Sequence, residues 1–121
     1  MEQESNQTES FRGRSSDRVR LNRAATLILS DSQQDAPLEV QLVDLSCEGA
    51  GLISATWVSV DRLVVLVLGQ ALQPQHAIRG TVIDCLPVGE QFRISIRFDP
   101  RDERAIRRIE DAFFRTDHLD Y

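Results

Sequence analysis

The chain has 121 residues and a mass of 13.7 kDa, which suits one domain, and its 41% of hydrophobic residues are enough for one modest core. Nineteen acids against fourteen bases give a formal net charge of −5, so binding of duplex nucleic acid by the whole protein is not expected. The longest apolar run, Leu63 to Leu68, is far shorter than the roughly 20 residues that cross a bilayer. No signal-like segment opens the chain. We therefore expect a cytoplasmic protein without membrane insertion.

Arginine and cysteine usage narrow the chemistry. All fourteen basic residues are arginine, whose planar guanidinium suits paired hydrogen bonds to a phosphate or a base edge and stacking on a ring. Cys47 and Cys85 lie far apart in the sequence without a Cys-x-x-Cys spacing, so we expect free thiols and neither a disulfide scaffold nor a zinc ribbon.

The N-terminal quarter divides into two segments of opposite character. Residues 1–11 are mainly Glu, Gln, Asn, Ser and Thr, a composition that predicts a disordered tail. Residues 12–23 form a basic segment with glycine and serine, in which Asp17 is the only acid, and we predict a flexible arginine arm here. Its arginines are Arg12, Arg14, Arg18, Arg20 and Arg23.

Residues 24–98 carry strand patterns and are predicted to form a β-barrel. Apolar and polar residues begin to alternate at Val19 and Leu21, and strand-like stretches follow in order, with Trp57 assigned to the core. These stretches lie around residues 25–29, 38–43, 51–54, 58–68, 77–86 and 92–98. The last alternates most regularly and should direct Arg93 and Arg97 towards solvent or an anion.

The period changes at the C-terminal end. Asp99 as N-cap, Pro100 at the first helical position and apolar residues at Ile106, Ile109 and Phe113 predict a helix over residues 100–115. We therefore predict a mostly β fold, a small six-stranded antiparallel β-barrel with a C-terminal α-helix, spanning residues 12–116 and followed by a tail over 117–121.

The sequence gives little support for catalysis. His76 lies in a predicted loop and His118 beyond the helix, and both are expected to be solvated. No Gly-x-Ser-x-Gly or Walker motif is present, and two cysteines and two histidines show no metal-ligand spacing. We expect neither an enzyme nor a metal or cofactor.

Two short motifs remain as functional candidates. Arg14 and Arg18 form an Arg-x-x-x-Arg pair, and Asp44, Ser46 and Gly49 form an Asp-x-Ser-x-x-Gly pattern at the end of a predicted strand. Taken alone, the first is also compatible with a solvated charged face. The second is also compatible with an Asx or Ser turn in which glycine supplies a positive φ.

Together and in this order, the two motifs resemble the signature of the PilZ domain, the bacterial receptor module for cyclic di-GMP. The resemblance covers about residues 12–115. It implies that Arg14 and Arg18 contact phosphate and the Hoogsteen edge of guanine and stack on the base. It also implies that Asp44 and Ser46 hydrogen-bond a guanine and that Gly49 lets the backbone turn closely under the ligand. Arg12 and Asp84 are further candidates for the site.

The resemblance further implies a mechanism without catalysis. Cyclic di-GMP, the only ligand expected, would order the arginine arm over the barrel, and an unidentified protein partner would read the result. Gly13 stands where many PilZ domains have arginine, which leaves open whether one nucleotide or a stacked pair is bound. Two alternatives are a PilZ-like adaptor without nucleotide binding and a small barrel that binds single-stranded RNA, although few aromatic side chains are available for the latter.

Overall fold

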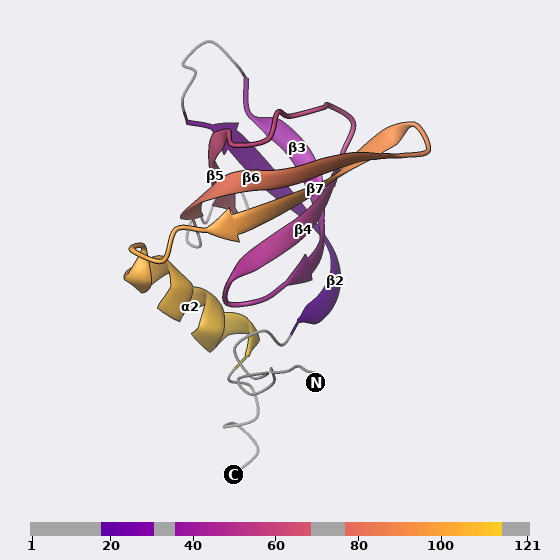
Figure 1. The fold of residues 1–121 in the computed structure, drawn as a ribbon. Helices are drawn as coiled ribbons and strands as arrows, with labels where there is room; N and C mark the ends of the chain where they lie inside the picture. Colours follow the sequence, from indigo (N-terminus) through magenta and orange to yellow (C-terminus); the bar gives the residue numbers. More distant parts are fainter. Residues whose placement is uncertain (1–17, 31–35, 69–76, 115–121) are drawn as a thin grey trace, which may run out of the picture.

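The fold is a closed antiparallel β-barrel with one helix packed against it, as the sequence predicts (Figure 1). The computed structural model describes residues 18–30, 36–68 and 77–114. Within these residues six strands close in the order β2-β3-β4-β7-β6-β5. The elements are β2 (Val19–Leu29), β3 (Leu38–Leu45), β4 (Gly49–Ser54), β5 (Leu63–Val67), β6 (Ala77–Val88), β7 (Gln91–Phe98) and α2 (Glu103–Phe113).

The core fills the inside of the barrel and continues under the helix. Each strand contributes inward aliphatic side chains, such as Leu27, Leu52 and Ile94, which are fully buried. Helix α2 adds Ala105 and Ile109 to the same cluster. Because burial of one large aliphatic side chain stabilises a fold by about 1.5–3 kcal/mol, this shared core fixes the barrel and its helix together.

Strand β7 confirms the predicted alternation. Ile94, Ile96 and Phe98 are buried, whereas Arg93 and Arg97 lie on the outer face. The turn before β7 is tighter than expected, because β6 continues to Val88 and only two residues separate the strands. The resulting hairpin projects beyond the rest of the barrel (Figure 1).

The helix begins three residues later than predicted. Residues 99–102 form a turn in which the Asp99 carbonyl accepts the Asp102 N–H and the Asp99 carboxylate accepts the Arg101 N–H. Asp102, not Asp99, occupies the N-cap position, and its carboxylate accepts the backbone N–H of Arg79 at 3.1 Å instead of capping the helix. Strand β6 thus competes for the capping group.

Three other expectations are corrected. Residues 19–23 belong to β2 and not to a flexible arm, because they pair with the end of β3. Residues 58–62 belong to the connection from β4 to β5, so the strand predicted over 58–68 is shorter and covers Leu63–Val67. Trp57 is 58% exposed and does not belong to the core. The predicted tails over 1–11 and 117–121 lie outside the described residues.

Candidate functional site

A β-bulge at the end of β3 turns Asp44 out of the barrel. Leu42 is buried inside, and uninterrupted alternation would direct Asp44 inwards two residues later. The register shifts between these residues, so Asp44 pairs with Gly51 on the outer face and Leu45 returns to the core. The bulge therefore presents a carboxylate on the barrel surface without leaving a charge in the core.

Asp44 is held by two arginines from distant parts of the chain. Its Oδ1 accepts a hydrogen bond from Arg18 Nη1 at 2.7 Å, and its Oδ2 accepts one from Arg93 Nη2 at 2.7 Å. The Asp44 side chain is 14% exposed, whereas the Arg18 and Arg93 side chains are 58% and 41% exposed. Arg18 immediately precedes β2, the first strand described, and Arg93 lies on β7, the last strand. The Asp44 carboxylate therefore connects the first and the last strand regions of the barrel.

Gly51 provides the space in which this cluster forms. Arg93 pairs with Ile53 on β4, and its guanidinium must cross β4 to reach Asp44 on β3. A Cβ at Gly51 would lie 2.6 Å from both Arg93 Nη2 and Asp44 Oδ2. The absence of a side chain at this position is therefore necessary for the ion pair as it stands.

Ser46 closes the turn between β3 and β4. Its hydroxyl accepts the backbone N–H groups of Glu48 and Gly49, both at 3.1 Å, and donates to the Gly49 carbonyl at 3.3 Å. A hydroxyl has one donor and two acceptor sites, so all three are used inside the turn. With 1% of its surface exposed, Ser46 has the structural role of a serine turn in this state.

Gly49 is required for strand packing and not for a positive φ. Among the described glycines only Gly89 has a positive φ. A Cβ at Gly49 would lie 2.1 Å from the Ile96 carbonyl oxygen of the neighbouring strand β7. The close neighbour is thus protein backbone, which corrects the expectation of a left-handed turn residue.

Asp84 lies on the same outer face as Asp44. The register of β6 shifts between Val82, which is buried, and Asp84, which is exposed and pairs with Ser95. A row of cross-strand neighbours on the outer face runs through Arg20, Asp44, Gly51, Ser95 and Asp84. The two aspartates are three strands apart, roughly 14 Å, and Gly51 and Ser95 between them form a floor of small residues.

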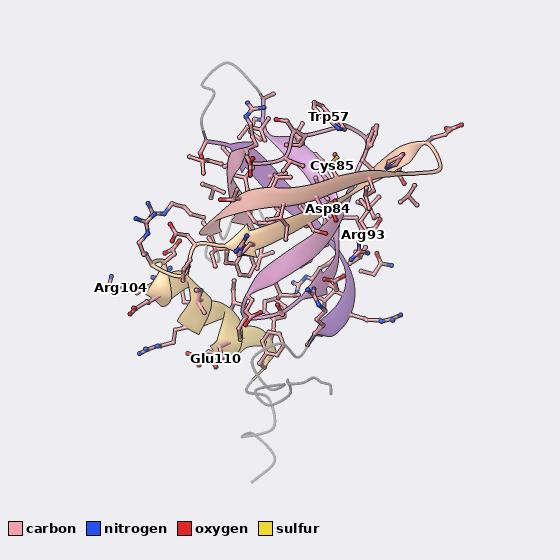
Figure 2. All side chains as sticks on the ribbon, viewed as in Figure 1. Trp57, Asp84, Cys85, Arg93, Arg104 and Glu110 are labelled. Atoms are coloured by element: carbon pink, nitrogen blue, oxygen red, sulfur yellow. The ribbon has the colours of Figure 1, made fainter. Side chains whose placement is uncertain are left out.

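Figure 2 locates two of these outer-face residues, Asp84 and Arg93, in the whole molecule. Asp84 and Arg93 lie beside the middle of the β6–β7 pair, away from Arg104 and Glu110 on helix α2 (Figure 2). Arg12 and Arg14 lie outside the described residues. The structure therefore brings Arg18, Asp44 and the Ser46–Gly49 turn together and adds Arg93 and Gly51 to them. The sequence signal for Arg93 was its predicted outward position on a regular strand, while Gly51 gave no separate signal.

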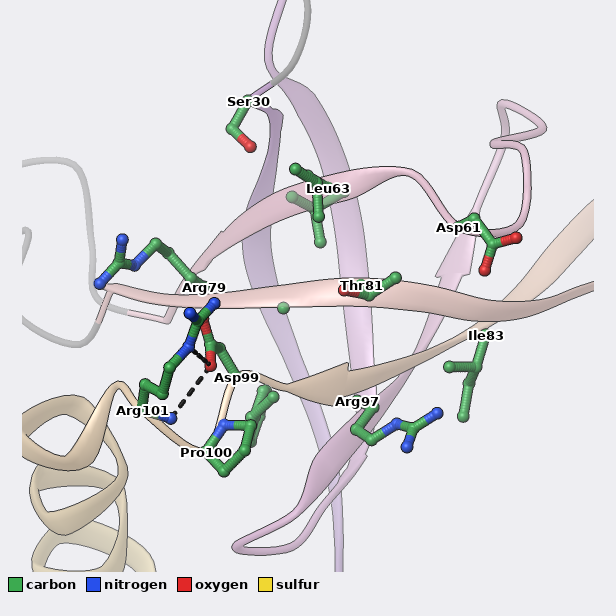
Figure 3. Close-up of a pocket in the computed structure, with 13 residues that line it drawn as sticks. Ser30, Asp61, Leu63, Arg79, Thr81, Ile83, Arg97, Asp99, Pro100 and Arg101 are labelled. Atoms are coloured by element: carbon green, nitrogen blue, oxygen red, sulfur yellow. Dashed lines mark hydrogen bonds and ion pairs between the residues drawn. The ribbon is translucent and has the colours of Figure 1, made fainter.

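A hollow of about 440 Å³ lies elsewhere, where β5 and β6 meet the connection from β7 to α2 (Figure 3). Asp99 accepts two side-chain hydrogen bonds from Arg101 here, both at 3.1 Å. The first of these, from Nε, together with the Arg101 backbone N–H lowers the pKa of the Asp99 carboxyl. The hollow contains none of the predicted site residues, and three arginines and two aspartates line it.

Over residues 18–30, 36–68 and 77–114, no group of three or more His, Cys, Asp or Glu side chains could hold a metal ion. Within the same ranges, no helix is long and apolar enough to cross a membrane.

The fold and the site define a small antiparallel barrel with a paired arginine and aspartate at its opening strands. The family model described as PilZ domain matches residues 12–115. The chain belongs to the PilZ domain family. Among curated proteins, no significant match to the chain was found.

Solved structures with the same fold include two bacterial proteins. The chain is 22% identical to K. pneumoniae MrkH in its cyclic di-GMP complex, with a TM-score of 0.64, over 86% of this chain and 52% of that chain. It is 20% identical to the PilZ domain of E. coli YcgR with cyclic di-GMP, with a TM-score of 0.56, over 86% of this chain and 95% of that domain. The chain thus spans about half the length of MrkH.

Proposed function

We propose that this protein is a receptor for cyclic di-GMP. The observation that carries the proposal is the 2.7 Å ion pair between Arg18 and Asp44, which joins the arginine motif to the aspartate motif across 26 residues of sequence. Family membership and the cyclic di-GMP complexes of the two structural neighbours support this reading.

The site chemistry matches the nucleotide. Cyclic di-GMP presents two phosphates, guanine O6 and N7 acceptors, and guanine N1–H and 2-amino donors. Arg14 and Arg18 would contact phosphate and the Hoogsteen edge, and Asp44 would accept from the guanine donors. The space over Gly51 is filled by the Arg93–Asp44 pair, and the next residue of the row towards Asp84 is the small Ser95. Arg12 and Asp84 remain candidates at the margins of this site.

Ser46 and Gly49 act in this proposal through the backbone. The Ser46 hydroxyl fixes the turn after Asp44, and Gly49 lets β4 approach β7 closely. Together they set the position of the Asp44 carboxylate. A direct hydrogen bond from Ser46 to guanine would require this turn to open.

Binding would convert one arrangement of arginines into another. In the free protein Arg18 is bound to Asp44, so the nucleotide has to exchange that contact for its own. Ordering each further residue of the preceding segment costs about 1–2 kcal/mol, which several charge-assisted hydrogen bonds must offset. We propose no catalytic step. The ordered segment would be the signal that a protein partner reads.

Calorimetric titration with cyclic di-GMP, with GTP as control, tests the proposal. Saturable binding that GTP does not reproduce supports a receptor, and the molar ratio distinguishes one nucleotide from a stacked pair. If no heat and no thermal shift are seen well above micromolar nucleotide, the receptor reading is wrong and the adaptor alternative takes its place.

A further inference from the structure

The two oxygens of Asp44 have different environments. Oδ1 is bound by Arg18, which is 58% exposed and lies at the very start of β2. Oδ2 is bound by Arg93, which lies near the start of β7 and pairs with Ile53 of β4 on one side and with Leu86 of β6 on the other. Arg18 can therefore leave Asp44 with little disturbance of the barrel, whereas Arg93 is attached to its most extensively paired part.

We infer that Arg93 is a positioning residue, which holds the Asp44 carboxylate in place for guanine when Arg18 turns to the nucleotide. This inference rests on the proposed function. Arg18 and the nucleotide compete for Oδ1, because Arg18 Nη1 occupies this oxygen in the free protein and a guanine donor would have to take its place. Once Oδ1 is released, Arg93 alone keeps the carboxylate from rotating and directs Oδ1 towards the guanine donors.

Gly51 makes this arrangement possible and gives a second way to disrupt it. An added Cβ would meet only side-chain atoms at 2.6 Å, Arg93 Nη2 and Asp44 Oδ2, and the former is the far end of a flexible chain. Gly51→Ala should therefore leave the barrel intact and push the Arg93 guanidinium and the Asp44 carboxylate apart. It breaks the same contact as Arg93→Ala while retaining the positive charge.

The test measures how well the site distinguishes guanine from hypoxanthine. Cyclic di-IMP lacks only the 2-amino groups of cyclic di-GMP and keeps its phosphates, N1–H and Hoogsteen edges. An aligned Asp44 should favour cyclic di-GMP by about tenfold or more, the effect of one hydrogen bond to a charged group. We expect Arg93→Ala and Gly51→Ala to reduce this ratio towards one. Arg97→Ala, which removes the next outward arginine of β7, should leave it unchanged.

Each outcome separates the inference from the proposed function. If the wild-type protein does not bind cyclic di-GMP, both fail. If it binds with the expected preference and Arg93→Ala retains that preference, only the inference fails. If Arg93→Ala loses the same affinity for both nucleotides, Arg93 is a phosphate contact, and the inference that it positions Asp44 is overturned. Should Arg93→Ala not fold, Arg93→Gln keeps the stem of the side chain without the charge and is expected to give the same reduced ratio.

Discussion

Two aspartates on this barrel bind arginine side chains at similar distances, yet they have different roles. Asp99 is paired with Arg101, two residues away, and the side chains of the two are 20% and 88% exposed. Asp44 is paired with residues 26 and 49 positions away; its side chain is 14% exposed, and those of Arg18 and Arg93 are 58% and 41% exposed. The Asp99 pair shapes one turn, whereas the Asp44 cluster links β3, β7 and the residue that precedes β2.

The difference lies in what surrounds each carboxylate. An exposed ion pair within one turn is screened by water and contributes little to the fold. A β-bulge places Asp44 on the outer surface. Gly49 allows β4 to pack closely against β7, and Gly51 leaves the space through which Arg93 reaches the carboxylate. Several local features of the sequence serve this one carboxylate, which is expected of a binding site and not of a general surface charge.

The largest expected effect concerns the backbone that carries Asp44. Gly49→Ala places a Cβ 2.1 Å from the Ile96 carbonyl oxygen, so β4 and β7 must separate locally. We expect a loss of about 3 kcal/mol or more in the free energy of unfolding, measured by urea denaturation. Gly89→Ala is the control, since its positive φ costs about 1 kcal/mol but no atom lies within 4 Å of the added Cβ. Equal losses would show that strand packing at Gly49 has been overestimated.

Arg18→Ala comes next and affects binding more than folding. We expect the free energy of cyclic di-GMP binding, measured by calorimetry, to weaken by about 3 kcal/mol or more, because phosphate and base contacts are lost together. The thermal midpoint should change by less than about 4 °C, because the Arg18 side chain is 58% exposed. Arg101→Ala is the matched control and should retain full affinity. A large loss of stability in Arg18→Ala would identify a structural arginine.

Asp44→Ala should weaken cyclic di-GMP binding by about 1.5–3 kcal/mol, the contribution of hydrogen bonds to a charged acceptor. It should also lower the free energy of unfolding by about 1 kcal/mol, since Arg18 and Arg93 lose their shared partner but remain partly hydrated. Asp99→Ala tests the comparison directly, because it removes a similar ion pair and should leave the affinity unchanged. Unchanged affinity in Asp44→Ala would remove this residue from the site.

The smallest expected effect is the pH dependence of the stability that the Asp99–Arg101 pair contributes to the fold. Hydrogen bonds from the Arg101 side chain and backbone lower the pKa of Asp99 below its ordinary value of 3.8. A carboxyl with a lower pKa in the folded state stabilises the fold while it is ionised. Its contribution is therefore complete above about pH 4 and is lost as the pH falls through the folded-state pKa. An NMR titration of the Asp99 carboxyl carbon should show this pKa, and Arg101→Ala should raise it. A midpoint at or above 3.8 would contradict the ion pair.

The sequence predicted the barrel and its helix, because these depend on periodicity and local patterns. The site residues were predicted from the resemblance to the PilZ signature. It did not predict the contact between Arg93 and Asp44, which depends on strand register across β4. A signal for the bulge was nevertheless present, since the buried residues Leu42 and Leu45 are spaced by three instead of two. The helix start was misplaced because Asp102 bonds to the backbone of Arg79, a tertiary contact that capping patterns do not reveal.

Closure of the barrel limits how this protein can be recognised. Every strand from β2 to β7 has a hydrogen-bonded neighbour on each side, but β5 pairs with β6 only over Ala77–Thr81 and with β2 only over Thr26–Leu29. An extended peptide therefore cannot join the fully paired part of the ring as an additional strand. Any molecule that binds this part of the ring has to recognise side chains on its outer surface. This gives the few charged groups there, and the glycines that make room for them, a large share of the specificity.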